Sequence, residues 1–142
     1  MASARWTVLN QLTRLNTAVY RLSGGRLLGR FRGAPVLLLN HVGRKSGKPR
    51  TSPLLYIEDG GKLVIVASKG GSHKHPDWWL NLRAQPETTV EVGGEKRSVV
   101  ARRASSEEKS RLWPRLVEMW PDYERYQGRT ERDIPVIVLE SP

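Results

Sequence analysis

Six short runs with the character of β-strands constrain the fold of this chain more than any other feature of its sequence. They span residues 36–39, 53–57, 62–68, 88–92, 95–104 and 134–139. Short runs separated by turn residues are typical of β-strands in hairpin order. Helical segments interrupt the series after the third and fifth runs, without the regular alternation of a doubly wound sheet. We therefore predict a mainly β (α+β) fold, a six-stranded antiparallel barrel with peripheral helices.

The segment after the third run predicts a short helix. Pro76 at a first helical position begins it, and the helix continues through Leu82. Trp78 and Trp79 are adjacent, so their side chains diverge by about 100° around a helix axis. We expect one of them to face the core and the other to face a pocket or solvent.

A second helical segment follows the fifth run. Ser105 and Glu108 have the spacing of a capping box, with Ser105 as the N-cap. Pro121 ends this helix, and a further helical turn carries Tyr123 and Tyr126. Because these two residues are three positions apart, we expect them on one face of that turn.

The N-terminal segment, residues 1–25, predicts an amphipathic helix, because leucines recur at helical spacing with arginines among them. Its apolar run is too short to span a bilayer. Two interpretations remain: the helix packs on the core, or it lies on a membrane surface. The sequence contains no repeat and no linker, so residues 1–142 are expected to form a single domain.

The charges are distributed unevenly along the chain. Residues 1–57 contain ten Arg and Lys and no Asp or Glu, whereas residues 58–142 contain fourteen residues of each sign. The net charge of +10 therefore belongs to the first two-fifths of the chain. This polarity predicts an anionic partner there: a phosphate, a polycarboxylate, a nucleic acid or an acidic lipid surface.

The turn between the first two apolar runs is the strongest candidate for the anion site. We refer to residues 43–50, with the sequence G-R-K-S-G-K-P-R, as the cationic turn. Exposed backbone N–H groups and cationic side chains converge in a glycine-containing turn of this kind. Pro53, just beyond it, lacks an N–H group and predicts a bulge or an edge strand.

The sequence argues against a metal centre. It contains no cysteine, which excludes thiol catalysis, zinc–thiolate sites and disulfides, and suits a reducing cytoplasm. His41, His73 and His75 are the only histidines, too few to complete a shell without other ligands. We expect no metal.

A series of motifs along the chain resembles one family. These are G-R-K-S-G-K-P-R with P-L-L-Y behind it, A-S-K-G-G, H-P-D-W-W-L-N-L-R-A-Q-P, L-W-P-R-L-V-E-M-W-P-D-Y-E-R-Y-Q and I-P-V-I-V-L-E. Together, and in this order, they resemble the deazaflavin-dependent nitroreductase family of actinobacteria. The resemblance covers the chain after the first helix.

This resemblance implies an FMN-binding split-barrel-like fold and hydride transfer from the reduced 8-hydroxy-5-deazaflavin coenzyme F-420 to a hydrophobic acceptor: a quinone, a nitroaromatic or an activated enone. The coenzyme carries a phosphodiester and an oligoglutamate tail, which suit the cationic turn. The cofactor-binding positions that the resemblance implies are Arg44, Lys45, Ser46, Gly47, Arg50, Pro53, Ala67, Ser68, Lys69, Gly70 and Trp78.

The coenzyme would supply the hydride, so the protein supplies position, water exclusion and a proton. A hydroxyl could stabilise or protonate the oxygen of the acceptor. Ser68, Tyr123 and Tyr126 are the catalytic candidates, although the tyrosines could equally well only pack the core. Leu55, Trp120 and the two tyrosines are expected to border the acceptor pocket. Trp120 and Leu55 replace residues of nitroimidazole-reducing members, which puts that activity in doubt.

Two other functions remain open at this stage. One is a barrel that binds flavin mononucleotide, which a basic phosphate-binding loop would serve equally well. The other is a non-catalytic basic module that binds an acidic membrane or nucleic acid. The aromatic residues cluster away from the basic ones, which argues against nucleic acid.

The reductase hypothesis predicts a cytoplasmic protein, with a peripheral contact through the N-terminal helix on the inner face of the membrane. The sequence does not indicate an oligomeric state.

Overall fold

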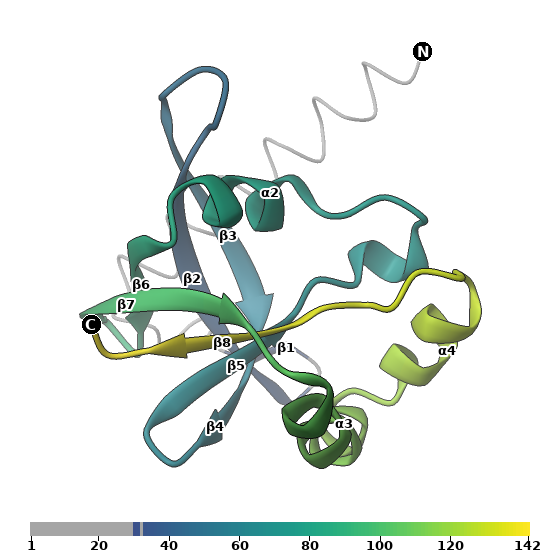
Figure 1. The fold of residues 1–142 in the computed structure, drawn as a ribbon. Helices are drawn as coiled ribbons and strands as arrows, with labels where there is room; N and C mark the ends of the chain where they lie inside the picture. The colour runs from purple at the N-terminus through teal and green to yellow at the C-terminus, as the bar shows by residue number, and fades with distance from the viewer. Residues whose placement is uncertain (1–29, 32) are drawn as a thin grey trace.

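A computed structural model of the protein describes residues 30–31 and 33–142 (Figure 1). The amphipathic helix expected in residues 1–25 lies outside the described residues. The strands are β1 (Arg30–Phe31), β2 (Ala34–Val42), β3 (Pro49–Leu55), β4 (Ile57–Asp59), β5 (Lys62–Val66), β6 (Glu87–Val92), β7 (Glu95–Arg103) and β8 (Val136–Glu140). The helices are a short 3-10 turn, η1 (Lys69–Gly71), and the α-helices α2 (Asp77–Ala84), α3 (Ser106–Met119) and α4 (Asp122–Gly128).

The strands form one curled antiparallel sheet, consistent with a split barrel. Their order is β1-β2-β6-β7-β8-β5-β4, and β3 pairs with β2 outside this path. In Figure 1, α2 lies over one end of the sheet, whereas α3 and α4 lie toward the opposite end and side. Helices therefore follow the strands in the predicted places, after the third and the fifth predicted strand.

The prediction of six strands is wrong, because the described part of the chain contains eight. β1 adds a two-residue pairing with the start of β2. The second predicted strand is divided at Tyr56: β3 follows β2 up to the pair Leu55–Val36, and β4 begins a new ladder with β5. Pro53 lies in β3 opposite Leu38, and β3 pairs with no described strand except β2. The expected edge strand is thus confirmed.

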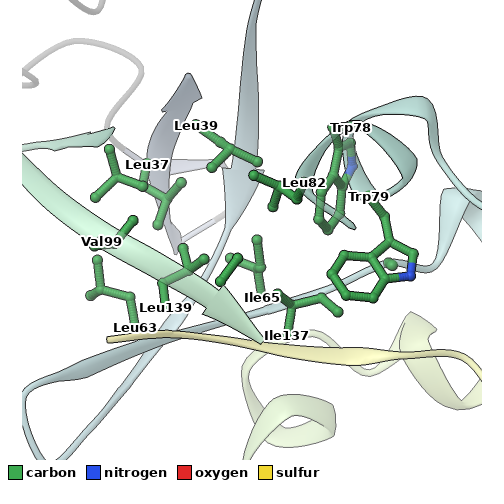
Figure 2. Close-up of a cluster of buried hydrophobic side chains, with 13 residues drawn as sticks. Leu37, Leu39, Leu63, Ile65, Trp78, Trp79, Leu82, Val99, Ile137 and Leu139 are labelled. Atoms are coloured by element: carbon green, nitrogen blue, oxygen red, sulfur yellow. The ribbon is translucent and has the colours of Figure 1, made fainter. Parts of the chain in front are cut away.

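Two hydrophobic clusters share β5 and β8. Leu63, Ile65, Ile137 and Leu139 join the cluster beneath α2, which Figure 2 shows. The alternate residues Val64, Val66, Val136 and Val138 join Leu112 and Leu116 of α3 in the second cluster. Successive side chains of a strand point to opposite faces, so both faces of these two strands are buried. This explains why the runs at 62–66 and 134–139 are apolar without alternation.

The capping box is confirmed. The Ser105 Oγ accepts a hydrogen bond from the Glu108 N–H at 3.2 Å, and the Glu108 Oε1 accepts one from the Ser105 N–H at 3.0 Å. The expectation that Trp78 and Trp79 face different environments is wrong, because both are buried in the first cluster. In Figure 2 both rings lie with Leu82 along this cluster. Because α2 closes one end of the barrel, more than one of its faces is covered.

Candidate functional site

The cationic turn projects beyond the sheet at the end of the β2–β3 hairpin, beside α2 (Figure 1). Two backbone hydrogen bonds close it: the Gly43 N–H donates to the Lys48 carbonyl at 2.9 Å, and the Gly47 N–H donates to the Gly43 carbonyl at 2.8 Å. The Ser46 Oγ accepts a further bond from the Lys48 N–H at 3.2 Å. The turn is therefore an ordered support for its cationic side chains.

Lys45, Lys48 and Arg50 are exposed, and none of them pairs with a carboxylate within the described residues. Arg44 is different, because α2 binds it. Its Nη1 donates to the Asn81 Oδ1 at 2.9 Å, and its Nη2 lies 3.4 Å from the Asp77 carboxylate. Arg44, one of the predicted anion ligands, therefore attaches the turn to α2. Lys45, Lys48 and Arg50 remain available to bind a ligand.

A buried polar chain continues from Arg44 into the sheet. The Asn81 Oδ1 also accepts from the Arg44 backbone N–H at 3.1 Å, so the amide NH₂ of Asn81 faces the His41 Nδ1, 3.0 Å away. His41 Nε2 then carries the proton and donates to the Ser52 Oγ at 3.0 Å. Burial, with a smaller contribution from the charge of Arg50, lowers the pKa of His41 to about 4. The imidazole is therefore neutral, and it connects the turn, α2 and β3.

Sequence reasoning missed both members of this chain. We considered His41 only as a metal ligand and did not single out Asn81. The available signal was a polar residue in an apolar setting: His41 lies in a strand of buried leucines, and Asn81 stands beside the buried Leu82. Buried polar groups are nearly always hydrogen-bonded, so each position indicates a partner that the sequence does not name.

The segment 67–72 forms the second part of the site. Ser68 has right-handed helical angles (φ −81°, ψ −37°). Lys69 and Gly70 follow in the left-handed region with φ of 46° and 63°. The backbone N–H groups of Ser68, Lys69 and Gly70 donate to no acceptor among the residues that the structure describes. A right-handed residue followed by a left-handed one makes a concave set of N–H groups that binds anions.

Gly71 brings this segment into contact with α4. Its φ is +84°, and a Cβ added there would lie 2.7 Å from the carbonyl oxygen of Tyr126. Only glycine fits both conditions. The close approach places Ser68 and Tyr126, two of the three catalytic candidates, on neighbouring elements. The Arg129 guanidinium strengthens the contact by donating to the Gly70 carbonyl at 3.3 Å.

The two candidate tyrosines differ in environment. Tyr123 is buried in the second cluster, and burial, followed by the nearby Tyr126, raises the pKa of its hydroxyl. Tyr126 is only half-buried, and its ring meets that of Tyr123 edge to face at 6.1 Å between centroids. The expectation that they share a face of the helix is confirmed. Tyr126 is the more accessible of the two.

The remaining predicted residues lie at more than one place. Trp78 is a buried residue of α2, and Pro53 and Leu55 lie on the edge strand β3. Trp120 ends α3, and its ring lies 5.7 Å from that of Phe31 in β1. Within residues 30–31 and 33–142, no three His, Asp or Glu side chains are grouped to hold a metal ion. Nor is any described helix long and apolar enough to cross a membrane.

A curled antiparallel half-barrel with an acid-free cationic turn at one end defines a split-barrel-like β-protein with unpaired cations gathered on one hairpin. Comparison with known proteins assigns it more narrowly. Residues 12–141 match the model of the family described as F420H(2)-dependent quinone reductase. The chain therefore belongs to this family of oxidoreductases, in agreement with the resemblance noted from its motifs.

Individual relatives agree. The F420H(2)-dependent quinone reductase Rv1261c of Mycobacterium tuberculosis is 43% identical over 133 residues, 91% of this chain and 89% of the relative. A solved F420-H2 dependent reductase, FDR-A, is 42% identical with a TM-score of 0.69, over 75% of this chain and 94% of its own. A structure described as a domain-swapped dimer is 35% identical with a TM-score of 0.71, over 97% and 99% of the two chains.

Proposed function

We propose that this protein transfers a hydride from the reduced deazaflavin coenzyme F-420 to a quinone. The observation that carries the proposal is the cationic turn, whose Lys45, Lys48 and Arg50 have no carboxylate partner in the described structure. Unpaired cations on an ordered turn fit a ligand that carries a phosphodiester and several carboxylates. The family and the names of the relatives support the same ligand.

The residues present fit the coenzyme at two places. Lys45, Lys48 and Arg50 would bind its anionic tail, while Arg44 holds the turn against α2. The free N–H groups of residues 68–70 suit a phosphate or carbonyl oxygen of the coenzyme. When bound, the reduced coenzyme supplies the hydride, and the protein contributes orientation and a proton.

The proton completes the reaction, because a quinone that accepts a hydride at one oxygen or carbon becomes an anion that must be protonated to give the hydroquinone. We assign this role to Tyr126, with Ser68, on the neighbouring segment, as the other candidate hydroxyl. Tyr123 is the weaker candidate, because the raised pKa of its buried hydroxyl makes it a poorer acid. Leu55 and Trp120 would border the acceptor, and nitroaromatic or enone acceptors remain part of the same proposal.

The test begins with a fluorescence titration of the protein with the deazaflavin coenzyme, in parallel with flavin mononucleotide and with the coenzyme lacking its glutamate tail. We expect saturable binding of the deazaflavin, weakened by removing the tail and by added salt. A quinone reduction assay then follows the oxidation of the bound coenzyme. Preference for flavin mononucleotide would overturn the choice of coenzyme, and binding without turnover of any quinone would overturn the reaction.

A Tyr126→Phe variant tests the proton donor. It should lower kcat by about tenfold or more while the coenzyme affinity stays within twofold, since only the hydroxyl is lost. The matched Tyr123→Phe variant should change kcat less. A larger loss for Tyr123→Phe would exchange the two roles.

The proposal extends to organisation and location. The family model spans nearly the whole chain, which supports one domain over residues 1–142. A peripheral membrane contact through residues 1–25 would give access to a lipid quinone. Cosedimentation with anionic vesicles, compared with neutral ones, tests this contact.

A further inference from the structure

We propose that Arg132 is a positioning residue for coenzyme binding: its guanidinium holds the carbonyl groups of Ala67, Ser68 and Ser72 on one side, so that the free N–H groups of Ser68 and Lys69 face the ligand on the other. This inference rests on the proposed function, because it assumes that the coenzyme occupies this segment. Arg132 lies outside the motifs that suggested the site, and none of its contacts follows from the sequence.

The Arg132 guanidinium is bound almost entirely by carbonyl oxygens. Its Nε donates to the Ser72 carbonyl at 2.8 Å, and its Nη2 donates to the Ser68 carbonyl at 2.8 Å. Both terminal nitrogens lie 3.2 Å from the Ala67 carbonyl. One rigid group therefore joins both ends of the segment, which a flexible ammonium with a single nitrogen does not do.

The remaining neighbour of the guanidinium is also uncharged. Nη1 lies 3.3 Å from the Nδ1 of His75, whose pKa is lowered by burial and then by the charge of Arg132. No carboxylate pairs with Arg132 in the part of the chain that the structure describes. Most arginines in this half of the chain have such a partner, so the contacts of Arg132 are directed to the backbone and its positive charge is left unneutralised beside the segment.

The carbonyl contacts determine which way the N–H groups point. In a trans peptide the C=O and the following N–H point in opposite directions, and no described peptide is cis. Because the carbonyls of Ala67 and Ser68 point to Arg132, the N–H groups of Ser68 and Lys69 point away from it. Within residues 68–70, these are two of the three N–H groups, none of which has an acceptor in the described structure.

The segment needs such a support, because its conformation is unfavourable on its own. Lys69 is the only described non-glycine residue with a positive φ, at 46°. The left-handed region costs a residue with a Cβ roughly 1 kcal/mol or more, so neighbouring contacts must hold it there. Arg132 supplies hydrogen bonds on both sides of Lys69, to the carbonyls of Ser68 and Ser72.

The experiment measures the dissociation constant of the coenzyme for the full-length wild type and for Arg132→Lys, using the fluorescence titration described above. Lysine keeps the charge but not the planar fork. We expect Arg132→Lys to weaken binding of the coenzyme at least tenfold relative to the wild type. For the coenzyme without its glutamate tail, the variant should lose affinity relative to the wild type by a similar factor. Arg103→Lys is the matched control, because Arg103 binds Asp133 and not the segment; its affinity should stay within twofold of the wild type.

Two further measurements separate positioning from charge and from stability. Arg132→Ala should recover coenzyme affinity in a few millimolar guanidinium chloride but not in sodium chloride of equal concentration, because only guanidinium can occupy the vacated site. If Arg132→Ala does not fold, the lysine variant carries the test, with its melting temperature recorded beside its affinity.

The outcomes are distinct. If the wild type binds the coenzyme and Arg132→Lys binds it within twofold, the positioning role is wrong although the proposed function stands. Equal losses in Arg132→Lys and Arg103→Lys would also overturn it, since they would indicate a general effect of this surface. If the wild type itself does not bind the coenzyme, the proposed function fails and this inference fails with it.

Discussion

The cationic turn and the surface around α3 are both rich in arginine and lysine, yet only one of them neutralises its charge. Around α3, Arg102 bonds to Glu140 at 2.6 Å and to Glu108 at 2.7 Å, and Arg111 and Arg115 share Asp59 at 2.9 and 3.0 Å. We refer to these six residues as the α3 ion-pair network. On the turn, Lys45, Lys48 and Arg50 face solvent without an acidic partner in the described structure.

This difference shows that net charge alone is a poor guide to a binding site. The α3 ion-pair network contains as many cationic side chains as the turn offers to a ligand, but its carboxylates already occupy them. Exposed ion pairs contribute little to stability, whereas unpaired cations gathered on an ordered turn raise the local potential for an anion. The informative observation is therefore which cations the protein leaves unpaired.

The largest expected effect concerns the polar chain that supports the turn. Asn81→Leu leaves the Arg44 N–H and the His41 Nδ1 without their partner. Because the His41 imidazole is buried and the Arg44 N–H is partly buried, we expect the free energy of unfolding to fall by about 3 kcal/mol. Urea denaturation measures this change. The matched variant Asp59→Asn in the α3 ion-pair network should lower the free energy of unfolding by about 1 kcal/mol or less. Equal losses in the two variants would show that the polar chain stabilises the protein no more than the exposed ion pairs do.

The two regions should also respond to acid in different pH ranges. The pKa of His41 is about 4 in the folded protein against 6.5 unfolded, so the unfolded chain binds an extra proton between these values. Stability therefore falls as the pH is lowered from 6.5 to 4, by on the order of 3 kcal/mol. A His41→Gln variant should lose this part of the pH dependence in denaturation curves.

The α3 ion-pair network titrates at lower pH. Hydrogen bonds from Arg102 and then from the Ser105 N–H lower the pKa of Glu108 to about 2 from 4.5. Its stabilisation is present above pH 4.5 and is lost as the pH falls toward 2. If the free energy of unfolding of wild type and of His41→Gln depended equally on pH above 4.5, the interpretation of His41 as a neutral buried imidazole would be wrong.

A smaller effect is expected for a single cation of the turn. Lys45→Ala should raise the dissociation constant of the coenzyme about tenfold, or about 1.4 kcal/mol, and reduce its dependence on salt. Lys96→Ala is the control, because Lys96 is an exposed lysine in β7, opposite Glu91 of β6 and away from the turn. The same fluorescence titration serves both variants. Equal losses would mean that only the overall charge matters.

The smallest effect is expected for a paired arginine. Arg111→Ala removes one of the two partners of Asp59 and leaves Arg115 in place. The free energy of unfolding should fall only slightly, because an exposed ion pair contributes little, and the affinity for the coenzyme should not change. A measurable loss of affinity would show that the α3 ion-pair network also takes part in binding.

Much of the fold could be predicted from the sequence, because its signals are local. The capping box, the helices after the third and fifth predicted strands and the edge position of Pro53 each follow from residues close together in the chain. The division of the second predicted strand at Tyr56 did not follow, because β3 and β4 pair with different partners. Apolar character marks a strand, but it does not indicate where one ladder ends and another begins.

The site was predicted less completely. The cationic turn was evident because its cations and glycines are consecutive, and the motifs indicated the segment around Ser68. The residues that hold these parts were missed, since their contacts join distant positions: Asn81 is 37 residues from Arg44, and Arg132 is 65 from Ala67. Whether the predicted ligand-binding residues act as proposed stays a prediction until the titrations are made.

The sharing of β8 between the two hydrophobic clusters also has a consequence for folding. This strand hydrogen-bonds to β5 and β7 and sends alternate side chains into the cluster beneath α2 and the cluster beneath α3. Neither cluster is complete until β8 is in place, although its partner β5 lies some 70 residues earlier in the chain. Such non-local pairing is typical of slow folding. The cluster beneath α2 and the cluster beneath α3 should therefore unfold together, in one cooperative transition.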